Sequence, residues 1–267
     1  MFDRRLGARE GRLFLAYLID IDGTLMNASV VNEGAAEFIK DINSDGTRYL
    51  LMTNSIKRLD VQKNRLRSVG IGVKDNCIIN PIVAINRYLE GKGIERARII
   101  GTQDEIAQVN VEYAESDAEI VILLDFEKGD KGYRDLQGIL DEMEKGVEVI
   151  TASISPYYFK DGSKTIDTGA FVGLLENVSG KRIINFGKPA KAYFDIAASM
   201  LKEELKSIYV IGDDWSTDIK GANDWGAKSI LVKSGKYNSG DEDKESPSIL
   251  INSLIDMKRT HRTIAST

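Results

Sequence analysis

Two carboxylates lie one residue apart in Asp20-Ile21-Asp22, directly after an apolar run and before Gly23. In a continuing strand these side chains would point to opposite faces of the sheet. A glycine lets the chain turn sharply at the strand end, so both carboxylates can face one small volume. Crowded carboxylates raise one another's pKa unless a cation neutralises them, and Mg²⁺ binds carboxylates together with water and phosphate oxygens. The motif therefore indicates a magnesium site, although the same side chains could cap backbone N–H groups in an Asx turn.

A second acidic group follows another apolar run, which ends at Gly212. Asp213 could complete the shell of a bound metal. Asp218 could orient that shell by accepting hydrogen bonds or by holding a water. The alternative is that this segment caps a helix through Asp214 or Ser216.

Two further segments offer groups suited to a phosphate. Thr53, Asn54 and Ser55 present hydroxyl and backbone N–H groups at a strand end, where they could hold phosphoryl oxygens. Thr53 could equally be an N-cap or turn residue. Lys188 comes just before a helix opened by Pro189, where its ammonium could neutralise a nucleophilic carboxylate and a bound phosphate together. It could also be a solvated surface lysine.

Apolar runs of strand length position these polar groups, and they alternate with segments of helical period, such as residues 35–42, 133–143 and 193–201. The alternation predicts an α/β fold with a Rossmann-like, doubly wound parallel sheet. In such sheets the site lies outside the carboxyl ends of the strands, so distant segments can share one crevice. The predicted strands are Phe14–Ile19, Arg48–Met52, Arg98–Ile100, Glu119–Leu124, Val147–Thr151, Arg182–Phe186, Ser207–Ile211 and Lys228–Val232.

The middle of the chain differs from its two ends. Residues 80–181 also alternate strands and helices, but Asp125 is the only comparable acidic strand end there. We expect this segment to form a large α/β domain inserted into a discontinuous core domain made of residues 1–79 and 182–267. The polar stretch 234–248 is expected to be a loose surface loop.

Composition and charge exclude several classes of function. The 267 residues include 36 Lys and Arg against 41 Asp and Glu, with a formal net charge of −5, so no nucleic-acid partner is expected. The apolar content of 42% suits a soluble globular protein. No stretch approaches the ~20 apolar residues that cross a membrane, and the Arg-rich residues 1–12 lack the apolar run of a signal peptide. We therefore expect no membrane partner.

The single cysteine and the single histidine narrow the chemistry further. Cys77 alone cannot form an intramolecular disulfide or a thiolate zinc site, which favours a cytoplasmic location. His261 lies in the polar C-terminal tail, so histidine-based catalysis is excluded unless the tail folds back. We expect chemistry on carboxylates, hydroxyls and lysines. The sequence is compatible with a monomer or a homo-oligomer.

In this order along the chain, the motifs resemble those of the haloacid dehalogenase (HAD) superfamily of phosphatases. The chain is most similar to the NagD-like branch, which includes the 4-nitrophenylphosphatases and the phosphoglycolate and glycerol-phosphate phosphatases. The resemblance extends to Thr168-Gly169-Ala170 and covers the chain apart from residues 1–12 and the extreme C-terminus. The four motifs that carry it are residues 20–24, 53–55, 188–189 and 212–218.

The resemblance implies a Mg²⁺-dependent phosphatase that hydrolyses a small phosphomonoester through an aspartyl-phosphate intermediate. It implies that Asp20 is the nucleophile and that Asp22 protonates the leaving oxygen and then activates water. Mg²⁺ would be bound by Asp20, by the carbonyl of Asp22 and by Asp213, with Asp218 behind these ligands. The inserted domain would act as a cap that limits access to the site.

The resemblance also implies which residues hold the phosphoryl group and the substrate. Thr53, the backbone of Asn54 and Lys188 would hold the phosphoryl oxygens, and Gly23 and Ser55 would belong to the same substrate-binding loops. The candidate substrates are 4-nitrophenyl phosphate, glycerol phosphate, phosphoglycolate, a sugar phosphate and a nucleotide monophosphate.

The cap departs from the family pattern, since residues 151–158 stand where relatives show Asn-x-Asp. Ser153, Ser155 and Tyr157 could face the substrate, or Tyr157, Tyr158 and Phe159 could pack the cap. Asp125 could bind substrate or cap a turn.

Two other functions compete with a phosphatase. One is a phospho-receiver signalling module, which also groups Asp, Thr and Lys around Mg²⁺, but which lacks an acid two residues after the phosphorylated one. The other is a non-catalytic HAD-fold binding protein, against which the four intact motifs argue.

Overall fold

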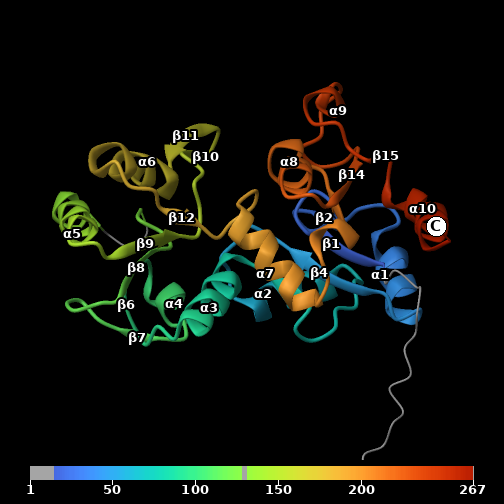
Figure 1. Ribbon diagram of the computed structural model, residues 1–267. Coiled ribbons are helices and arrows are strands. Elements are labelled where there is room, and N and C mark those ends of the chain that lie inside the picture. The colour runs from blue at the N-terminus through green and yellow to red at the C-terminus, as the bar shows by residue number, and fades with distance from the viewer. Residues whose placement is uncertain (1–14, 128–130, 267) are drawn as a thin grey trace, which may run out of the picture.

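The structure, a computed structural model, describes residues 15–127 and 131–266. It contains two parallel β-sheets, each flanked by helices, that lie side by side (Figure 1). Phe14, expected to begin the first strand, and the Arg-rich residues 1–12 lie outside the described residues. Among the helices that are described, none combines the length and the apolar character needed to cross a bilayer.

The larger sheet has six parallel strands in the order β15-β14-β13-β1-β4-β5. Every residue of β1 is buried, as expected of a parallel strand that is covered on both faces. The chain adds strands on both sides of β1, which creates a topological switch point at its carboxyl end. The predicted doubly wound α/β fold is confirmed. The strands are Ala16–Asp20 (β1), Arg48–Met52 (β4), Ile78–Ile79 (β5), Ile208–Gly212 (β13), Lys228–Val232 (β14) and Ile249–Ile251 (β15).

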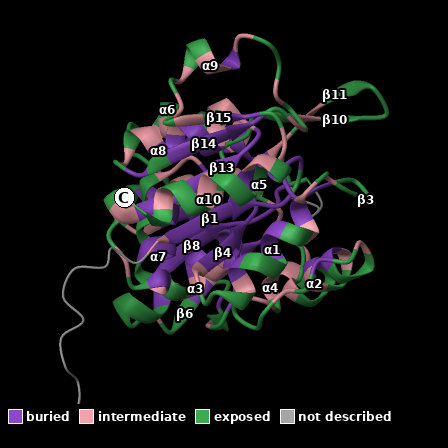
Figure 2. Ribbon diagram, turned by 90° about the vertical axis from the view of Figure 1, so that its right-hand side faces the viewer, coloured by how far each residue is buried: buried purple, intermediate pink, exposed green. Residues whose placement is uncertain are grey.

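Helices cover both faces of this sheet. Ala16 and Leu18 of β1 belong to one hydrophobic cluster and Tyr17 and Ile19 to another, because successive strand residues point to opposite faces. Figure 2 shows the buried strands in purple among helices with exposed outer sides. The first face is covered by α7 (Lys191–Leu201) and α8 (Lys220–Asp224), and the second by α1 (Ala35–Ser44), α2 (Leu59–Ser68) and α10 (Met257–Ala265).

The smaller sheet has five parallel strands in the order β12-β9-β8-β6-β7. Ile184 of β12 pairs with Ile150 of β9, so this sheet extends past residue 181, where we expected the core to resume. Its strands are Arg96–Ile100 (β6), Glu112–Tyr113 (β7), Ile120–Leu123 (β8), Glu148–Thr151 (β9) and Ile184–Asn185 (β12). They are accompanied by α4 (Gln103–Ile106), α5 (Tyr133–Glu144), α6 (Thr168–Ser179) and the hairpin of β10 (Tyr157–Lys160) and β11 (Ser163–Ile166).

Helix α3 (Pro81–Lys92) joins the two sheets. Its N-terminus is capped by Asn80, whose side chain accepts the backbone N–H of Val83 at 2.9 Å. The buried face of α3, which includes Ile85, packs in one hydrophobic cluster with Leu18 of the larger sheet and Ile122 of the smaller one. A continuous apolar core therefore ties the second domain to the edge of the first.

Candidate active site

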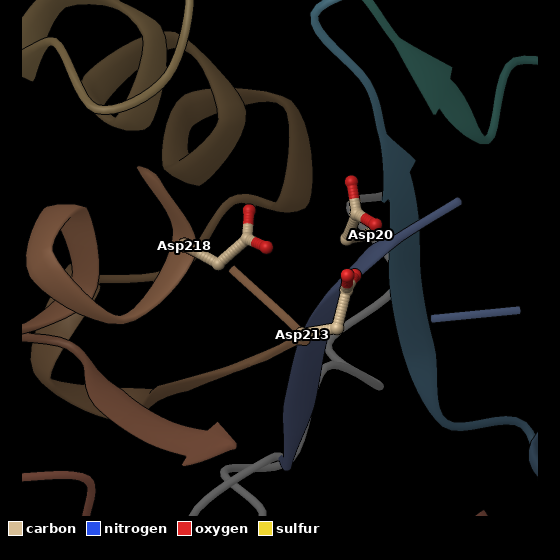
Figure 3. Close-up of side chains that lie close together, drawn as sticks. All are labelled: Asp20, Asp213 and Asp218. Carbon is tan, nitrogen blue, oxygen red and sulfur yellow. The ribbon is translucent and has the colours of Figure 1, made fainter. Parts of the chain in front are cut away.

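Three carboxylates meet at the carboxyl ends of adjacent strands in the larger sheet. Asp20 is the last residue of β1, Asp213 follows β13, and Asp218 lies in the short π-helix Trp215–Ile219 that comes next. Figure 3 shows their side chains converging. One oxygen from each lies within 4.8 Å of the others, and all three residues are at least 96% buried. The structure thus brings together acids that are nearly 200 positions apart in the sequence.

Lys188 enters this cluster from the loop between β12 and α7. Its Nζ lies 2.5 Å from Asp20 Oδ1 and 2.7 Å from Asp218 Oδ1, and the residue is buried. Asn54 holds the lysine in place, because its side-chain amide donates to the Lys188 carbonyl at 3.0 Å and its Oδ1 accepts the Lys188 N–H at 2.7 Å. Lys188 is therefore a buried ion-pair partner rather than a solvated surface lysine.

The electrostatics of the cluster favour an additional cation. Burial raises the pKa of Asp20 well above its ordinary value; Lys188 opposes this rise, and the Asp218 and Asp213 charges add to it. Burial lowers the pKa of Lys188, but the charges of Asp20 and Asp218 outweigh that effect and raise it. With all four groups ionised, the three carboxylates and the one ammonium would carry a net charge of −2 in a buried volume.

A divalent ion fits this arrangement. Asp20 Oδ2 is buried and has no hydrogen-bond partner among the residues that the structure describes, although buried polar atoms are almost always paired. An ion with oxygen ligands would satisfy this atom and cancel the excess charge. Asp20, Asp213 and Asp218 are the residues that could hold it.

Asp22 lies outside the buried carboxylate group. Its side chain is 44% exposed, and its Oδ2 accepts the Thr53 hydroxyl at 3.2 Å. The same hydroxyl oxygen accepts the backbone N–H of Ser55 at 3.0 Å. Thr53 and Ser55 therefore form a turn against Asp22, and the predicted metal ligation through the Asp22 carbonyl stays a prediction.

Gly23 allows the close approach of the first and last motifs. Its φ is +102°, and a Cβ at this position would lie 2.6 Å from the carboxylate carbon of Asp213. Thr24 reinforces the approach, since its hydroxyl donates to Asp213 Oδ1 at 2.7 Å. The Asn32 side chain fixes the turn by donating to the Gly23 carbonyl at 2.6 Å.

The second acidic group serves both of the roles considered for it. Asp213 and Asp218 join the buried cluster, while Asp214 Oδ1 accepts the backbone N–H of Ser216 at 2.9 Å as a helix cap. The two interpretations of this segment therefore apply to different residues within it.

Residues 234–248, expected to be a loose surface loop, are largely exposed, but the first part of this segment packs against the site. The Lys236 N–H donates to Asp213 Oδ2 at 2.7 Å, and its Nζ pairs with Asp214 at 2.9 Å. A short helix, α9 (Asp241–Lys244), follows. The order of the strands could have indicated this contact. The segment follows β14, which is parallel to β13 and lies beside it, so both strands end at the edge of the sheet that carries the site.

A cavity of about 690 Å³ lies between the two domains, and its lining includes Asn54, the residue that bonds to Lys188. Asn54 and Ser55 line it from the core, and Asp125, Ser153 and Tyr158 line it from the second domain. Ser155 and Tyr157, which we considered as substrate contacts, are exposed residues outside this lining. The side chain of Phe159 lies outside the described part of the structure.

The C-terminal tail folds back onto the core domain. His261 lies in α10, where Nδ1 is 2.9 Å from the Tyr17 hydroxyl and Nε2 is 2.8 Å from Asp45 Oδ2. These contacts join the helix to the second face of the sheet, where Tyr17 packs. The histidine thus contacts the structural core and not the carboxylate cluster.

The fold and the site together define a two-domain α/β protein with buried carboxylates at the switch point of its larger sheet. Residues 17–113 match the family model for haloacid dehalogenase-like hydrolases, and residues 185–257 match a second model, described as HAD-hydrolase-like. The chain belongs to the HAD-like hydrolases, as its motifs indicated.

Two named relatives align with this chain over most of both sequences. Haloacid dehalogenase-like hydrolase domain-containing protein 2 of Bos taurus is 26% identical over 238 residues, which cover 88% of this chain and 90% of the relative. The sugar-phosphatase AraL of Bacillus subtilis (strain 168) is 24% identical over 249 residues, or 91% of each sequence.

Solved structures share the fold. NagD from E. coli K-12 superposes with a TM-score of 0.79 at 23% identity, covering 89% of this chain and 96% of NagD. The p-nitrophenyl phosphatase from Archaeoglobus fulgidus gives a TM-score of 0.80 at 22% identity, with coverage of 92% and 98%. The predicted NagD-like architecture, a HAD core with a large cap, is therefore confirmed.

Proposed function

We propose that the protein is a Mg²⁺-dependent phosphatase that hydrolyses small phosphomonoesters through an aspartyl-phosphate. The observation that carries the proposal is the buried group of Asp20, Asp213, Asp218 and Lys188 at the switch point of the sheet. The names of the relatives support the reaction class, since they include a sugar-phosphatase and a p-nitrophenyl phosphatase.

Asp20 is the nucleophile in this proposal. Lys188 binds Oδ1 and so orients the carboxylate, while Oδ2, which has no hydrogen-bond partner among the described residues, can bind the ion. An oxygen of Asp20 forms a bond to phosphorus as the ester oxygen departs with a proton from Asp22. Water then attacks phosphorus, Asp22 accepts its proton, inorganic phosphate leaves and the Asp20 carboxylate is restored.

Positive charges in the site stabilise the phosphoryl group during its transfer. Phosphoryl transfer is catalysed mainly by positioning and by neutralising charge on the equatorial oxygens. Lys188 supplies one positive charge from the chain, and Mg²⁺, when bound by Asp20 and Asp213 with Asp218 behind them, supplies the rest. Asn54 contributes by fixing the backbone of Lys188.

The substrate-binding residues surround the phosphoryl position. We propose that Thr53 and the N–H groups near Gly23, Asn54 and Ser55 bind phosphoryl oxygens. The leaving group occupies the interdomain cavity, whose 690 Å³ is in the range of small-molecule sites. Small esters such as 4-nitrophenyl phosphate, glycerol phosphate, phosphoglycolate, a sugar phosphate or a nucleotide monophosphate remain the candidate substrates. A cytoplasmic location and a homo-oligomer stay predictions.

A phosphatase screen tests the proposal. Purified protein is assayed for phosphate release from 4-nitrophenyl phosphate and from a metabolite panel, with Mg²⁺ and with EDTA. We expect release only with the metal. Asp20→Asn should abolish turnover while circular dichroism shows an unchanged fold, and Asp75→Asn, at an exposed carboxylate, is the matched control. Full activity of Asp20→Asn would refute the assignment of the nucleophile, and activity in EDTA would refute the role of the metal.

A further inference from the structure

A guanidinium from helix α2 reaches the carboxylate that we propose as the general acid and base. Arg65 lies in the last turn of α2, and its Nη2 donates to Asp22 Oδ1 at 2.8 Å. The two residues are 43 positions apart. The side chain of Arg65 is 27% exposed and that of Asp22 is 44% exposed. Partly exposed ion pairs contribute little to stability, so the main consequence of this pair is for the orientation of Asp22.

Arg65 is itself held by two other groups. Its Nη1 donates to Gln62 Oε1 at 2.8 Å, and Gln62 is fully buried. Its Nη2 also donates to the Ala28 carbonyl at 3.3 Å, in the turn between β2 (Met26–Asn27) and β3 (Val30–Val31). A guanidinium presents its donors in a rigid planar fork. The bonds to Gln62 and Ala28 therefore fix the direction in which Arg65 approaches Asp22.

The other oxygen of Asp22 is held from the opposite loop. Oδ2 accepts the Thr53 hydroxyl at 3.2 Å, and the backbone N–H of Thr53 lies 3.2 Å from the buried hydroxyl of Tyr193. A half-exposed aspartate with no such partners would sample several rotamers. Donors on both oxygens restrict the carboxylate to one orientation, and only Arg65 among these donors comes from outside the phosphoryl-binding loops.

We infer that Arg65 is a positioning residue that holds the Asp22 carboxylate where it exchanges a proton with the leaving oxygen. The inference rests on the proposed function, because it assigns a role relative to Asp22 as general acid. Proton transfer by a placed side chain contributes ~10²- to 10⁴-fold to a rate, and a displacement of ~1 Å costs ~10²-fold. Loss of Arg65 therefore lowers kcat and leaves KM nearly unchanged, since Lys188 and the metal ligands still bind the phosphoryl group.

Two substrates of similar shape separate this role from a general structural effect. Phenyl phosphate releases a poor leaving group that needs the proton of Asp22, whereas 4-nitrophenyl phosphate releases a good one that needs it little. For Arg65→Gln we expect kcat/KM to fall ~10- to 100-fold with phenyl phosphate and by less than ~3-fold with 4-nitrophenyl phosphate. This ratio reports the step in which the leaving oxygen departs, whereas kcat also includes hydrolysis of the aspartyl-phosphate, in which Asp22 acts as a base with both substrates. Arg67→Gln, which removes the same charge at an exposed position of the same helix, should behave as the wild type with both substrates.

Two further variants connect the effect to Asp22. In an Asp22→Asn background, Arg65→Gln should cause no additional loss, because the group that Arg65 positions is gone. Arg65→Lys keeps the charge but cannot reach Gln62, Ala28 and Asp22 together, so it should restore part of the rate with phenyl phosphate. If Arg65→Gln does not fold, Arg65→Lys carries the same two-substrate comparison.

Equal losses of kcat/KM on the two substrates, a loss expressed only in KM, or a further loss in the Asp22→Asn background would each overturn the role of Arg65. These outcomes leave the proposed function standing, because they presuppose measurable hydrolysis by the wild type. Absence of hydrolysis by the wild type with either ester would instead overturn the proposed function, and the inference with it.

Discussion

Replacing Gly235 with alanine tests how tightly the strand-end loops close on the proposed ion site. The φ of Gly235 is +50°, and a Cβ there would lie 2.5 Å from the Cα of Gly23 and closer still to Asp213 Oδ2. Ordinary carbon contacts are about 3.5–4.0 Å, so either the backbone or the carboxylate must move by about 1 Å. Asp213 cannot swing away freely, because the Thr24 hydroxyl and the Lys236 N–H each bind one of its oxygens at 2.7 Å.

The magnitude follows from this displacement. The left-handed backbone itself costs alanine about 1–2 kcal/mol of unfolding free energy, and disturbing the support of a metal ligand costs about 10–100-fold in metal affinity. We therefore expect Gly235→Ala to raise the Mg²⁺ concentration for half-maximal hydrolysis of 4-nitrophenyl phosphate by that factor.

Gly240→Ala is the matched control for Gly235→Ala. Its φ is +95°, but a Cβ at this position meets no atom of the described residues within 4 Å, so the control carries backbone strain without the collision. Both variants should lower the melting temperature, and only Gly235→Ala should change the Mg²⁺ titration. An unchanged Mg²⁺ titration in Gly235→Ala, or an equal shift in both variants, would refute the reasoning.

Two remaining predictions concern groups away from the site. Burial raises the pKa of Cys77 to about 11, so only about one thiol in a thousand is ionised at pH 8. A disulfide reagent should therefore label native protein slowly and denatured protein quickly, and rapid native labelling would contradict the buried placement. His261→Ala leaves the Tyr17 hydroxyl and Asp45 without their partner, which should cost about 1–3 kcal/mol in urea unfolding and leave kcat unchanged. Arg262→Ala, at an exposed position of the same helix, should leave the unfolding midpoint in place, and a wild-type midpoint for His261→Ala would refute the docking contact.

The strands that position the site were predictable because they are long enough to show a pattern. The runs at Arg48–Met52 and Lys228–Val232 match β4 and β14 in full. The shorter strands were not predicted. β5 has two residues and β15 has three, which is too few for any periodicity to appear. The pairing of β12 with the smaller sheet was also not predicted, because the sequence of a two-residue strand does not indicate which sheet it joins.

Within the site, residue type made some groups visible and left others hidden. A sequence such as Asp20-Ile21-Asp22 shows directly that acidic side chains stand at the end of a strand. In a parallel sheet such strand ends lie at one edge, so these side chains come close together. The amide of Asn54 and the N–H of Lys236 act through ordinary hydrogen bonds to Lys188 and Asp213. Almost every residue has a backbone N–H, so its use as a donor leaves no trace in composition or spacing.

Arg65 shows the same limit for a charged side chain. Helical periodicity can place Arg65 on α2, but the contact with Asp22 depends on how that helix packs against the turn that holds Ala28. That packing is set by long-range burial of residues such as Leu66, which a local pattern does not encode. Arg65 donates directly to Asp22 and Lys236 donates directly to Asp213, so folding brings to the predicted acids two residues whose local sequence carries no sign of that contact.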